Sequence, residues 1–272
     1  MKPAAFRYHR PTTPAEAWEA LAADPGAKVL AGGQSLVPLL SMRLAAPSAL
    51  VDINGIRGLD AIEITDEGVR VGALVRHADL LASPAAREAQ PLLALALSHV
   101  AHATIRNRGT CVGSIAHADP SAELPAVLAL LGGSLTAGSA RGTRVIPAAD
   151  LFIGPLETTL DHDELALAVT FPALPAGAGV AYDEIARRHG DYAMAGVAAL
   201  VAPDGTVTAS YVSCSEVPTV VDLTGVPDDE LGAVALRHLD PVEDIHATAD
   251  YRAHLVEVLT RRVVSEARKA RA

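Results

Sequence analysis

The segment from Pro172 to Gly179 constrains the fold of this 272-residue chain more than any other stretch. Its sequence, PALPAGAG, places two prolines and two glycines within eight residues. Proline cannot donate a backbone hydrogen bond and glycine weakens helices and strands, so neither element is expected to run through it. A chain of this length suits one large domain or two unequal ones. We therefore predict two domains, residues 1–175 and 176–272.

The hydrophobic pattern on both sides of this segment mixes helices with short strands. Thr13–Glu16 forms a capping box, with a hydroxyl N-cap, a proline and a glutamate, and predicts a helix that ends near Ala23. Residues 84–100 show a second helical pattern. Residues 61–73 and 193–214 each alternate around a central turn, which is typical of a β-hairpin. Strands and helices in this irregular order favour an α+β fold over a doubly wound sheet.

Composition excludes several classes of protein. Half of the residues are hydrophobic and 20% are charged, which excludes a disordered chain. The formal net charge of −10 argues against a nucleic-acid partner, because phosphate contacts need a basic surface. Cys111 and Cys214 are too few for a disulfide framework or a four-thiolate iron–sulfur cluster. With no signal peptide and no apolar run of roughly 18 residues, we expect a soluble cytoplasmic protein without a membrane span.

Two glycine-containing stretches are candidates for binding a phosphate or pyrophosphate. They are Ala31–Leu36 (AGGQSL) and Thr110–Ser114 (TCVGS), and we expect both to be loops. Glycine lets successive backbone amides converge on an anion, and nearby hydroxyls add donors. Amides are needed because the acidic chain must neutralise a pyrophosphate locally. The alternative is that both are ordinary tight turns. Neither matches the dinucleotide or P-loop fingerprint, so neither indicates a nicotinamide Rossmann site or a P-loop nucleotidase.

Other residues point to different chemistry. His99 and His102 are three residues apart, and His117 follows fifteen residues later, so the three histidines are a candidate zinc site of a hydrolase. The alternative is that His99 and His102 complement the dipole at a helix C-terminus. Cys111 is a candidate nucleophile, although no base can be assigned to it. Tyr192 follows a basic pair and a Gly-Asp turn and leads into a strand of small residues, a distinctive pattern for a binding site. The alternative is that Tyr192 is an ordinary residue at the edge of that strand.

Taken together, these stretches resemble the FAD-binding medium subunit of the molybdenum hydroxylases, the family of the carbon monoxide dehydrogenase medium chain and the flavin part of xanthine dehydrogenase. The stretches occur in the family's order and span nearly the whole chain. They are residues 28–38 (KVLAGGQSLVP), 105–124 (IRNRGTCVGSIAHADPSAEL), 187–197 (RRHGDYAMAGV) and 244–262 (DIHATADYRAHLVEVLTRR).

The resemblance implies a fold and a set of site residues. The fold is an α+β, two-subdomain FAD-binding domain of the vanillyl-alcohol-oxidase type. A small α+β C-terminal domain with a three-stranded antiparallel sheet and helices follows it. The first stretch and the second would wrap the pyrophosphate of non-covalent FAD, and Tyr192 would lie against the isoalloxazine as the catalytic residue. The implied cofactor-binding residues are Val29, Leu30, Ala31, Gly32, Gly33, Gln34, Ser35, Leu36, Thr110, Cys111, Val112, Gly113, Ser114, Asp119, Glu123, Asp183 and Tyr192.

Two positions depart from the family pattern. Val112 stands where the family usually has the first of two consecutive glycines. Valine disfavours a positive φ, so either the backbone of the second loop is accommodated differently or its contact with the cofactor is weaker. Asp183 stands where a lysine or another polar cofactor contact often lies, and a carboxylate cannot donate the same hydrogen bond.

The resemblance also implies partners. Electrons would pass from a large molybdenum–pterin subunit, through 2Fe–2S clusters on a small subunit, to FAD on this chain and then to an external acceptor. The assembly would be a dimer of heterotrimers, with no metal site on this chain. Two alternatives remain open at this point: a stand-alone flavin reductase or FAD-binding module, and the metal-dependent hydrolase built on the three histidines. The residues do not distinguish carbon monoxide, a purine or an N-heteroaromatic as the substrate of the complex.

Overall fold

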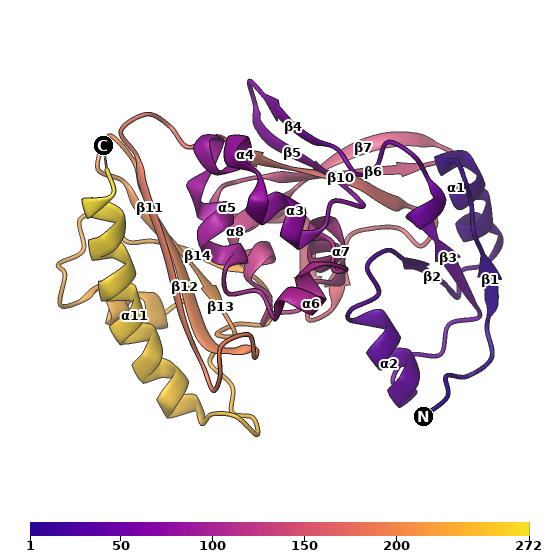
Figure 1. Cartoon of the computed structure of the whole chain (residues 1–272). Coiled ribbons are helices and arrows are strands. Elements are labelled where there is room, and N and C mark those ends of the chain that lie inside the picture. Colours follow the sequence, from indigo (N-terminus) through magenta and orange to yellow (C-terminus); the bar gives the residue numbers. More distant parts are fainter. Residues whose placement is uncertain (272) are drawn as a thin grey trace.

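The computed structural model describes residues 1–271 and forms three packed sheet regions with helices between them (Figure 1). The first is a small parallel sheet of three strands in the order β1-β3-β2. The elements of this region are β1 (Arg7–His9), α1 (Pro14–Ala23), β2 (Ala27–Leu30), α2 (Leu36–Met42), β3 (Ala49–Asp52) and the 3-10 turn η1 (Ile53–Gly55). Thr13 caps α1 by accepting a hydrogen bond from the amide of Glu16, as the sequence predicted.

The second region is a five-stranded antiparallel sheet in the order β4-β5-β10-β6-β7. Its strands are β4 (Ile62–Thr65), β5 (Gly68–Gly72), β6 (Ser134–Ser139), β7 (Gly142–Pro147) and β10 (Leu165–Pro172), and β8 (Phe152–Gly154) pairs separately with β9 (Glu157–Thr158). Its helices are α3 (His77–Ala82), α4 (Pro84–Ala89), α5 (Pro91–Leu97), α6 (Ala103–Arg106), α7 (Cys111–His117), α8 (Glu123–Leu130) and α9 (Ala148–Leu151).

The helix expected over residues 84–100 is in fact two helices, α4 and α5. Pro91 has no amide hydrogen and its ring clashes with the preceding turn, so one helix cannot pass through it. Gln90 joins the two helices: its side-chain carbonyl accepts from the amide of Leu92, and its amide group donates to Pro172 O at 2.8 Å. The break therefore also fastens the helical layer to the end of β10.

The third region is an antiparallel sheet in the order β11-β12-β13-β14, with α10 and α11 on its outer face. The elements are β11 (Gly179–Ala186), β12 (Ala193–Val201), β13 (Val207–Val212), β14 (Thr219–Asp222), α10 (Leu231–Leu236) and α11 (Ala249–Lys269). The expectation of a three-stranded sheet was wrong, because the short segment after Pro218 adds β14. Its β-branched residues Val220 and Val221 suit a sheet edge.

Two hydrophobic clusters hold these regions together. The larger one fills the space between the five-stranded sheet and helices α3–α8, and the smaller one lies between the four-stranded sheet and α10 and α11. Side chains from the inner face of the four-stranded sheet, among them Val180 and Tyr182, belong to the larger cluster. The inner face of that sheet thus packs on α5 and α8, while its outer face packs on α11 (Figure 1). None of the helices within residues 1–271 is long and apolar enough to span a membrane.

Candidate cofactor site

The first glycine stretch forms the predicted loop between β2 and α2. Val29 and Leu30 end β2, and α2 begins at Leu36. Gly33 has φ = +72°, a conformation that side chains other than glycine rarely adopt. The backbone amides of Gly32, Gly33 and Gln34 donate to no protein acceptor within residues 1–271. A loop with three consecutive unpaired amides is a suitable cradle for an anion.

Gly32 also brings this loop against the second stretch. A Cβ at Gly32 would lie 2.4 Å from Arg108 O and 2.8 Å from the Cα of Gly109, both of which are backbone atoms. The two stretches, 78 positions apart from Gly32 to Thr110, are therefore packed backbone to backbone. The structure brings together the two candidate phosphate-binding stretches that the sequence singled out.

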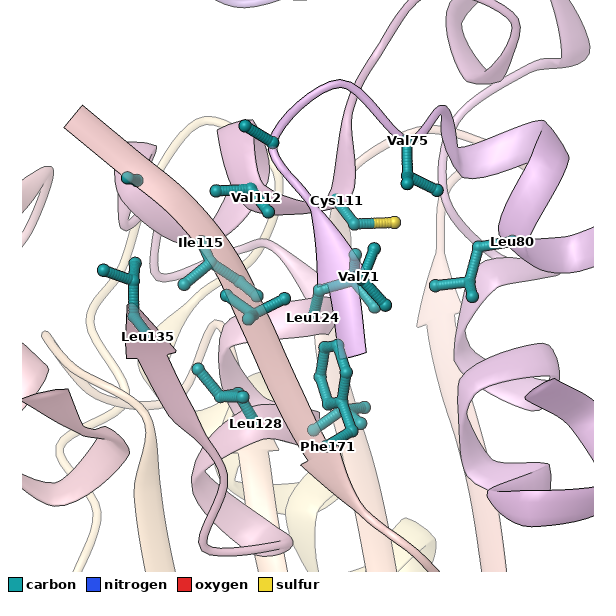
Figure 2. Packing of buried hydrophobic residues seen from close by; sticks show 14 of the residues in the cluster. Val71, Val75, Leu80, Cys111, Val112, Ile115, Leu124, Leu128, Leu135 and Phe171 are labelled. Carbon is teal, nitrogen blue, oxygen red and sulfur yellow. The ribbon is translucent and has the colours of Figure 1, made fainter. Parts of the chain in front are cut away.

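Only Thr110, the first residue of the second stretch, lies outside a helix, because α7 begins at Cys111. The expectation of a loop over Thr110–Ser114 was therefore wrong. Thr110 is the N-cap of α7, and its hydroxyl accepts a hydrogen bond from the amide of Gly113 at 3.1 Å. The helix forms because this cap satisfies one free amide and because three of its residues fill the core. Figure 2 shows these side chains, Cys111, Val112 and Ile115, packed among the buried hydrophobic residues.

This helical geometry explains the departure at Val112. Val112 does not have a positive φ, because it lies in the first turn of α7, so valine is accommodated there without strain. Ser114 follows two residues later in the same helix. Cys111 is fully buried, and burial raises the pKa of its thiol far above the usual range, so it is not a thiolate nucleophile.

Two residues that the sequence analysis missed join the two stretches. The guanidinium of Arg76 donates to Arg108 O at 2.6 Å and to the side-chain oxygen of Asn54 at 2.7 Å. The side-chain amide of Asn54 in turn donates to Ala31 O at 2.8 Å. Arg76 and Asn54 thus form a brace between the first loop and the chain that enters α7. In the sequence, Asn54 gave only a turn signal, and nothing marked Arg76.

The brace gives a direct prediction. Replacing Arg76 with alanine removes two charge-assisted hydrogen bonds, and we expect the free energy of unfolding to fall by about 2–3 kcal/mol. Arg70→Ala is the matched control, because Arg70 forms an exposed ion pair with Glu63, which contributes about 0–1 kcal/mol. Urea denaturation measures both values. Equal losses in the two variants would contradict a role for Arg76 in joining the stretches.

A group of acidic and aromatic side chains lies where α8 meets the four-stranded sheet. Glu123, the first residue of α8, is only 9% exposed, and its carboxyl group forms no hydrogen bond with a protein side chain within residues 1–271. Burial, and next the charge of Glu184, raises the pKa of Glu123 to about 8. At neutral pH Glu123 is therefore protonated, a buried acid that can donate a hydrogen bond to a molecule beside it.

Glu184 is held by two other residues at the same interface. It accepts a hydrogen bond from Tyr182 OH at 2.6 Å, and its other oxygen lies 3.6 Å from Nδ1 of His99. The neighbouring carboxylate of Glu184 raises the pKa of His99, which favours an ion pair between these residues. The contact between His99, in the segment that follows α5, and Glu184 of β11 therefore fixes the four-stranded sheet against the helical layer.

Tyr192 stands beside this group on the turn between β11 and β12. Its side chain is 63% exposed, and its pKa rises to about 12 because its hydroxyl is partly desolvated and lies near the carboxylate of Asp119. The turn needs Gly190, whose φ is +85° and where a Cβ would lie 2.6 Å from Nδ1 of His102. The structure thus places Tyr192, Asp119 and Glu123 in one region, and their roles at a cofactor stay predictions.

The remaining candidates lie elsewhere. Asp183 faces α11, where it accepts a hydrogen bond from Arg262 at 2.7 Å, so its role as a cofactor contact stays a prediction. The candidate zinc ligands do not converge: within residues 1–271 no three histidine, cysteine, aspartate or glutamate side chains form a group able to hold a metal ion. His99 instead pairs with Glu184, and His102 packs under Gly190.

Comparisons with known proteins bear directly on this site. Residues 4–174 match the family model described as "FAD binding domain in molybdopterin dehydrogenase". The chain is 40% identical to the 6-hydroxypseudooxynicotine dehydrogenase complex subunit alpha of Paenarthrobacter nicotinovorans, over 98% of this chain and 96% of that protein. It is 34% identical to the carbon monoxide dehydrogenase medium chain of Hydrogenophaga pseudoflava, with 98% of each covered.

The fold agrees with a solved structure over its whole length. A chain of carbon monoxide dehydrogenase from Hydrogenophaga pseudoflava, in a form that lacks the Mo-pyranopterin moiety of its cofactor, superposes with a TM-score of 0.95 at 31% identity. The match covers 100% of both chains. The sequence motifs, the paired glycine stretches and this likeness agree with one another. This chain therefore belongs to the family of FAD-binding medium subunits of the molybdenum-dependent dehydrogenases.

Proposed function

We propose that this chain carries FAD as the electron-transfer subunit of a heteromeric molybdenum dehydrogenase. The observation that carries the proposal is the pair of glycine stretches, where the first loop, with its three unpaired amides, packs against the chain that enters α7. An acidic chain holds a pyrophosphate best through backbone amides, because they carry partial positive charge without a basic side chain. The buried carboxyl of Glu123, which bonds no protein side chain within residues 1–271, supports the same cofactor, because flavin and ribityl groups offer hydrogen-bond acceptors.

The residues of this chain would bind and orient the cofactor, whereas the flavin, when bound, supplies the redox chemistry. We propose that the stretches 29–36 and 110–114 hold the pyrophosphate through their backbones, since Cys111 and Val112 point into the core. Glu123 would hold a proton at its carboxyl group and donate a hydrogen bond. Tyr192 would cover one flavin face and limit access to it, and Asp119 would orient Tyr192.

The electron donor must lie on another polypeptide. Cys111 and Cys214 are both buried free thiols, and no group of metal-binding side chains occurs within residues 1–271. Relatives are named as medium subunits or as subunits of dehydrogenase complexes. We propose a large molybdenum–pterin subunit and a small subunit with 2Fe–2S clusters as partners, assembled as a dimer of heterotrimers. The free thiols also support the proposal of a cytoplasmic location.

The domain boundary remains part of the proposal. Residues 1–175 would form the FAD-binding domain and residues 176–272 the C-terminal domain. Support comes from the two hydrophobic clusters and from the end of the family match at residue 174.

The test uses the assembled complex and the isolated chain side by side. Substrate added to the complex without oxygen should bleach the flavin absorption, whereas the isolated FAD-loaded chain should not respond to the same substrate. Rapid reduction of the isolated chain by NADH or NADPH, without partner subunits, would instead support the stand-alone reductase and contradict the proposal.

Tyr192 gives a prediction specific to the flavin face. We expect Tyr192→Ala to bind FAD within about threefold of the parent chain, because its side chain is largely exposed and adds little buried area. The uncovered flavin should react several-fold faster with an external oxidant, as followed by stopped-flow absorption after reduction. The exposed Tyr251→Ala on α11 is the control. A rate unchanged in Tyr192→Ala would remove Tyr192 from the proposed site.

A further inference from the structure

A pocket with a basic rim lies beside the turn that carries Tyr192. It has a volume of about 320 Å³, at the lower end of the range for small-molecule sites, and its lining residues are Arg187, Arg188, Asp191 and His246. The first three belong to the turn between β11 and β12, and His246 belongs to the segment before α11 (Figure 1). Because Tyr192 directly follows Asp191, the pocket lies next to the residue proposed to cover the flavin face.

The side of the pocket formed by the turn is held in one conformation. Gly190 has φ = +85°, and a Cβ there would lie 2.8 Å from the backbone oxygen of Ala101, so the turn packs closely on the segment after α5. The amide of Asp191 donates to Arg188 O at 3.0 Å, and the guanidinium of Arg188 forms an ion pair with the Asp191 carboxylate at 2.9 Å. These contacts fix the points at which the charged side chains leave the backbone.

The opposite side of the pocket is fixed by a buried arginine. Arg252 of α11 is only 5% exposed, forms an ion pair with Asp244 at 2.7 Å and donates to the backbone oxygen of Met194 in β12. Asp244 in turn accepts hydrogen bonds from the amides of His246 and Ala247 at 2.8 and 3.0 Å. Arg252 therefore ties the segment that carries His246 to the strand that the turn enters.

The charges around the pocket do not cancel. The carboxylates of Asp191 and Asp244 are each paired with an arginine. Arg187 is exposed and forms neither an ion pair nor a hydrogen bond within residues 1–271. On a chain with a formal net charge of −10, this free guanidinium gives an anion a local attraction. A guanidinium matches phosphate and carboxylate groups with two parallel hydrogen bonds, and the imidazole of His246 adds a further polar contact.

We propose that this pocket binds the oxyanion group, a phosphate or a carboxylate, of the external electron acceptor that reoxidises the flavin. Each reoxidation transfers two electrons to the acceptor, and the protons that leave the flavin pass to the solvent. Binding of the anionic group beside Tyr192 holds the rest of the acceptor at the edge of the flavin face. This inference rests on the proposed function and deepens it, because it names the chemical class of the acceptor.

The first test compares artificial acceptors of opposite charge. The FAD-loaded chain is reduced with dithionite without oxygen, freed of excess reductant and mixed in a stopped-flow instrument with ferricyanide, an anion, or with N-methylphenazinium, a cation. At low ionic strength we expect ferricyanide to oxidise Arg187→Gln about tenfold more slowly than the parent chain, and Arg187→Lys at a rate within about threefold of the parent. N-methylphenazinium should oxidise all three chains at rates within about twofold of one another.

Arg237→Gln is the matched control, because Arg237 is an exposed arginine that follows α10 and does not line the pocket. It should match the parent chain with both acceptors. The second test measures binding directly, by isothermal titration of the FAD-loaded chain with pyrophosphate and with malonate, which separates a phosphate site from a carboxylate site. Arg187→Gln should bind the preferred anion about tenfold more weakly, because the bidentate partner is lost.

Equal ferricyanide rates for Arg187→Gln and Arg237→Gln would overturn the inference, and so would failure of both anions to bind the FAD-loaded parent chain. Slower oxidation of Arg187→Gln by both acceptors would also overturn it, because Arg187 would then act on the flavin rather than on the anion. FAD content is measured in every sample, so a chain that takes up no flavin shows the failure of the proposed function. In that case, the difference in anion affinity between the parent and Arg187→Gln still decides whether the pocket binds anions.

Discussion

Replacing Gly32 with alanine is expected to lower the affinity for FAD by at least about 100-fold. The added Cβ would meet Arg108 O at 2.4 Å and the Cα of Gly109 at 2.8 Å, and neither backbone atom can move as a flexible side chain would. The first loop must therefore move away from the chain that enters α7. The two stretches proposed to hold the pyrophosphate then lose their alignment, and a loss of 100-fold corresponds to about 2.7 kcal/mol.

The control for this experiment is Gly154→Ala. Gly154 has an ordinary φ, and a Cβ there would meet only the side chain of Glu157, at 3.5 Å, which is normal van der Waals contact. Isothermal titration with FAD, together with circular dichroism to show that each variant is folded, separates loss of binding from loss of structure. A folded Gly32→Ala variant with the affinity of the parent chain would mean that the contact between the stretches is not part of the binding site.

A second large effect is expected from the pH dependence of stability at Glu123. Its folded-state pKa of about 8 lies above the ordinary value of 4.5, because the carboxyl group is buried near Glu184. A raised carboxyl pKa means that the folded chain retains the proton while the unfolded chain loses it. Stability of the FAD-free chain should therefore fall as pH rises from about 4.5 to 8, by up to 1.4 kcal/mol per pH unit and on the order of 4 kcal/mol in all.

Glu123→Gln should remove this slope, because glutamine keeps the shape and cannot ionise. At pH 8 the variant should therefore be more stable than the parent, while near pH 4.5 the two should be similar. Glu157→Gln, at an exposed position, should follow the parent curve. Urea denaturation at intervals between pH 4.5 and 8.5 gives the three curves. Parallel curves for Glu123→Gln and the parent would show that Glu123 is not the buried acid described above.

The sequence predicted those features that depend on local chemistry. Thr13 caps α1, residues 61–73 form a hairpin, and the glycines of the first loop mark a true break between β2 and α2. Family resemblance correctly indicated the fold and the function as an FAD-binding subunit. These signals work because a cap, a turn or a conformation with positive φ restricts which residue types can occupy one position.

The remaining features depend on contacts between distant positions. Thr110–Ser114 looked like a loop because of its glycine and hydroxyls, but Val112 and Ile115 pack in the core and stabilise a helix there. No local pattern shows that Arg76 meets Asn54 and Arg108, since these bonds join residues 22 and 32 positions apart. The pairing of His99 with Glu184 likewise arises only when the sheet packs on the helical layer.

The most direct measurement of the central claim is the flavin content of the purified, folded chain. We expect one FAD per chain, either bound on purification or taken up on addition, with flavin absorption that dithionite bleaches and FAD released unaltered on denaturation. A folded chain that contains no flavin and takes up none at micromolar FAD would contradict it.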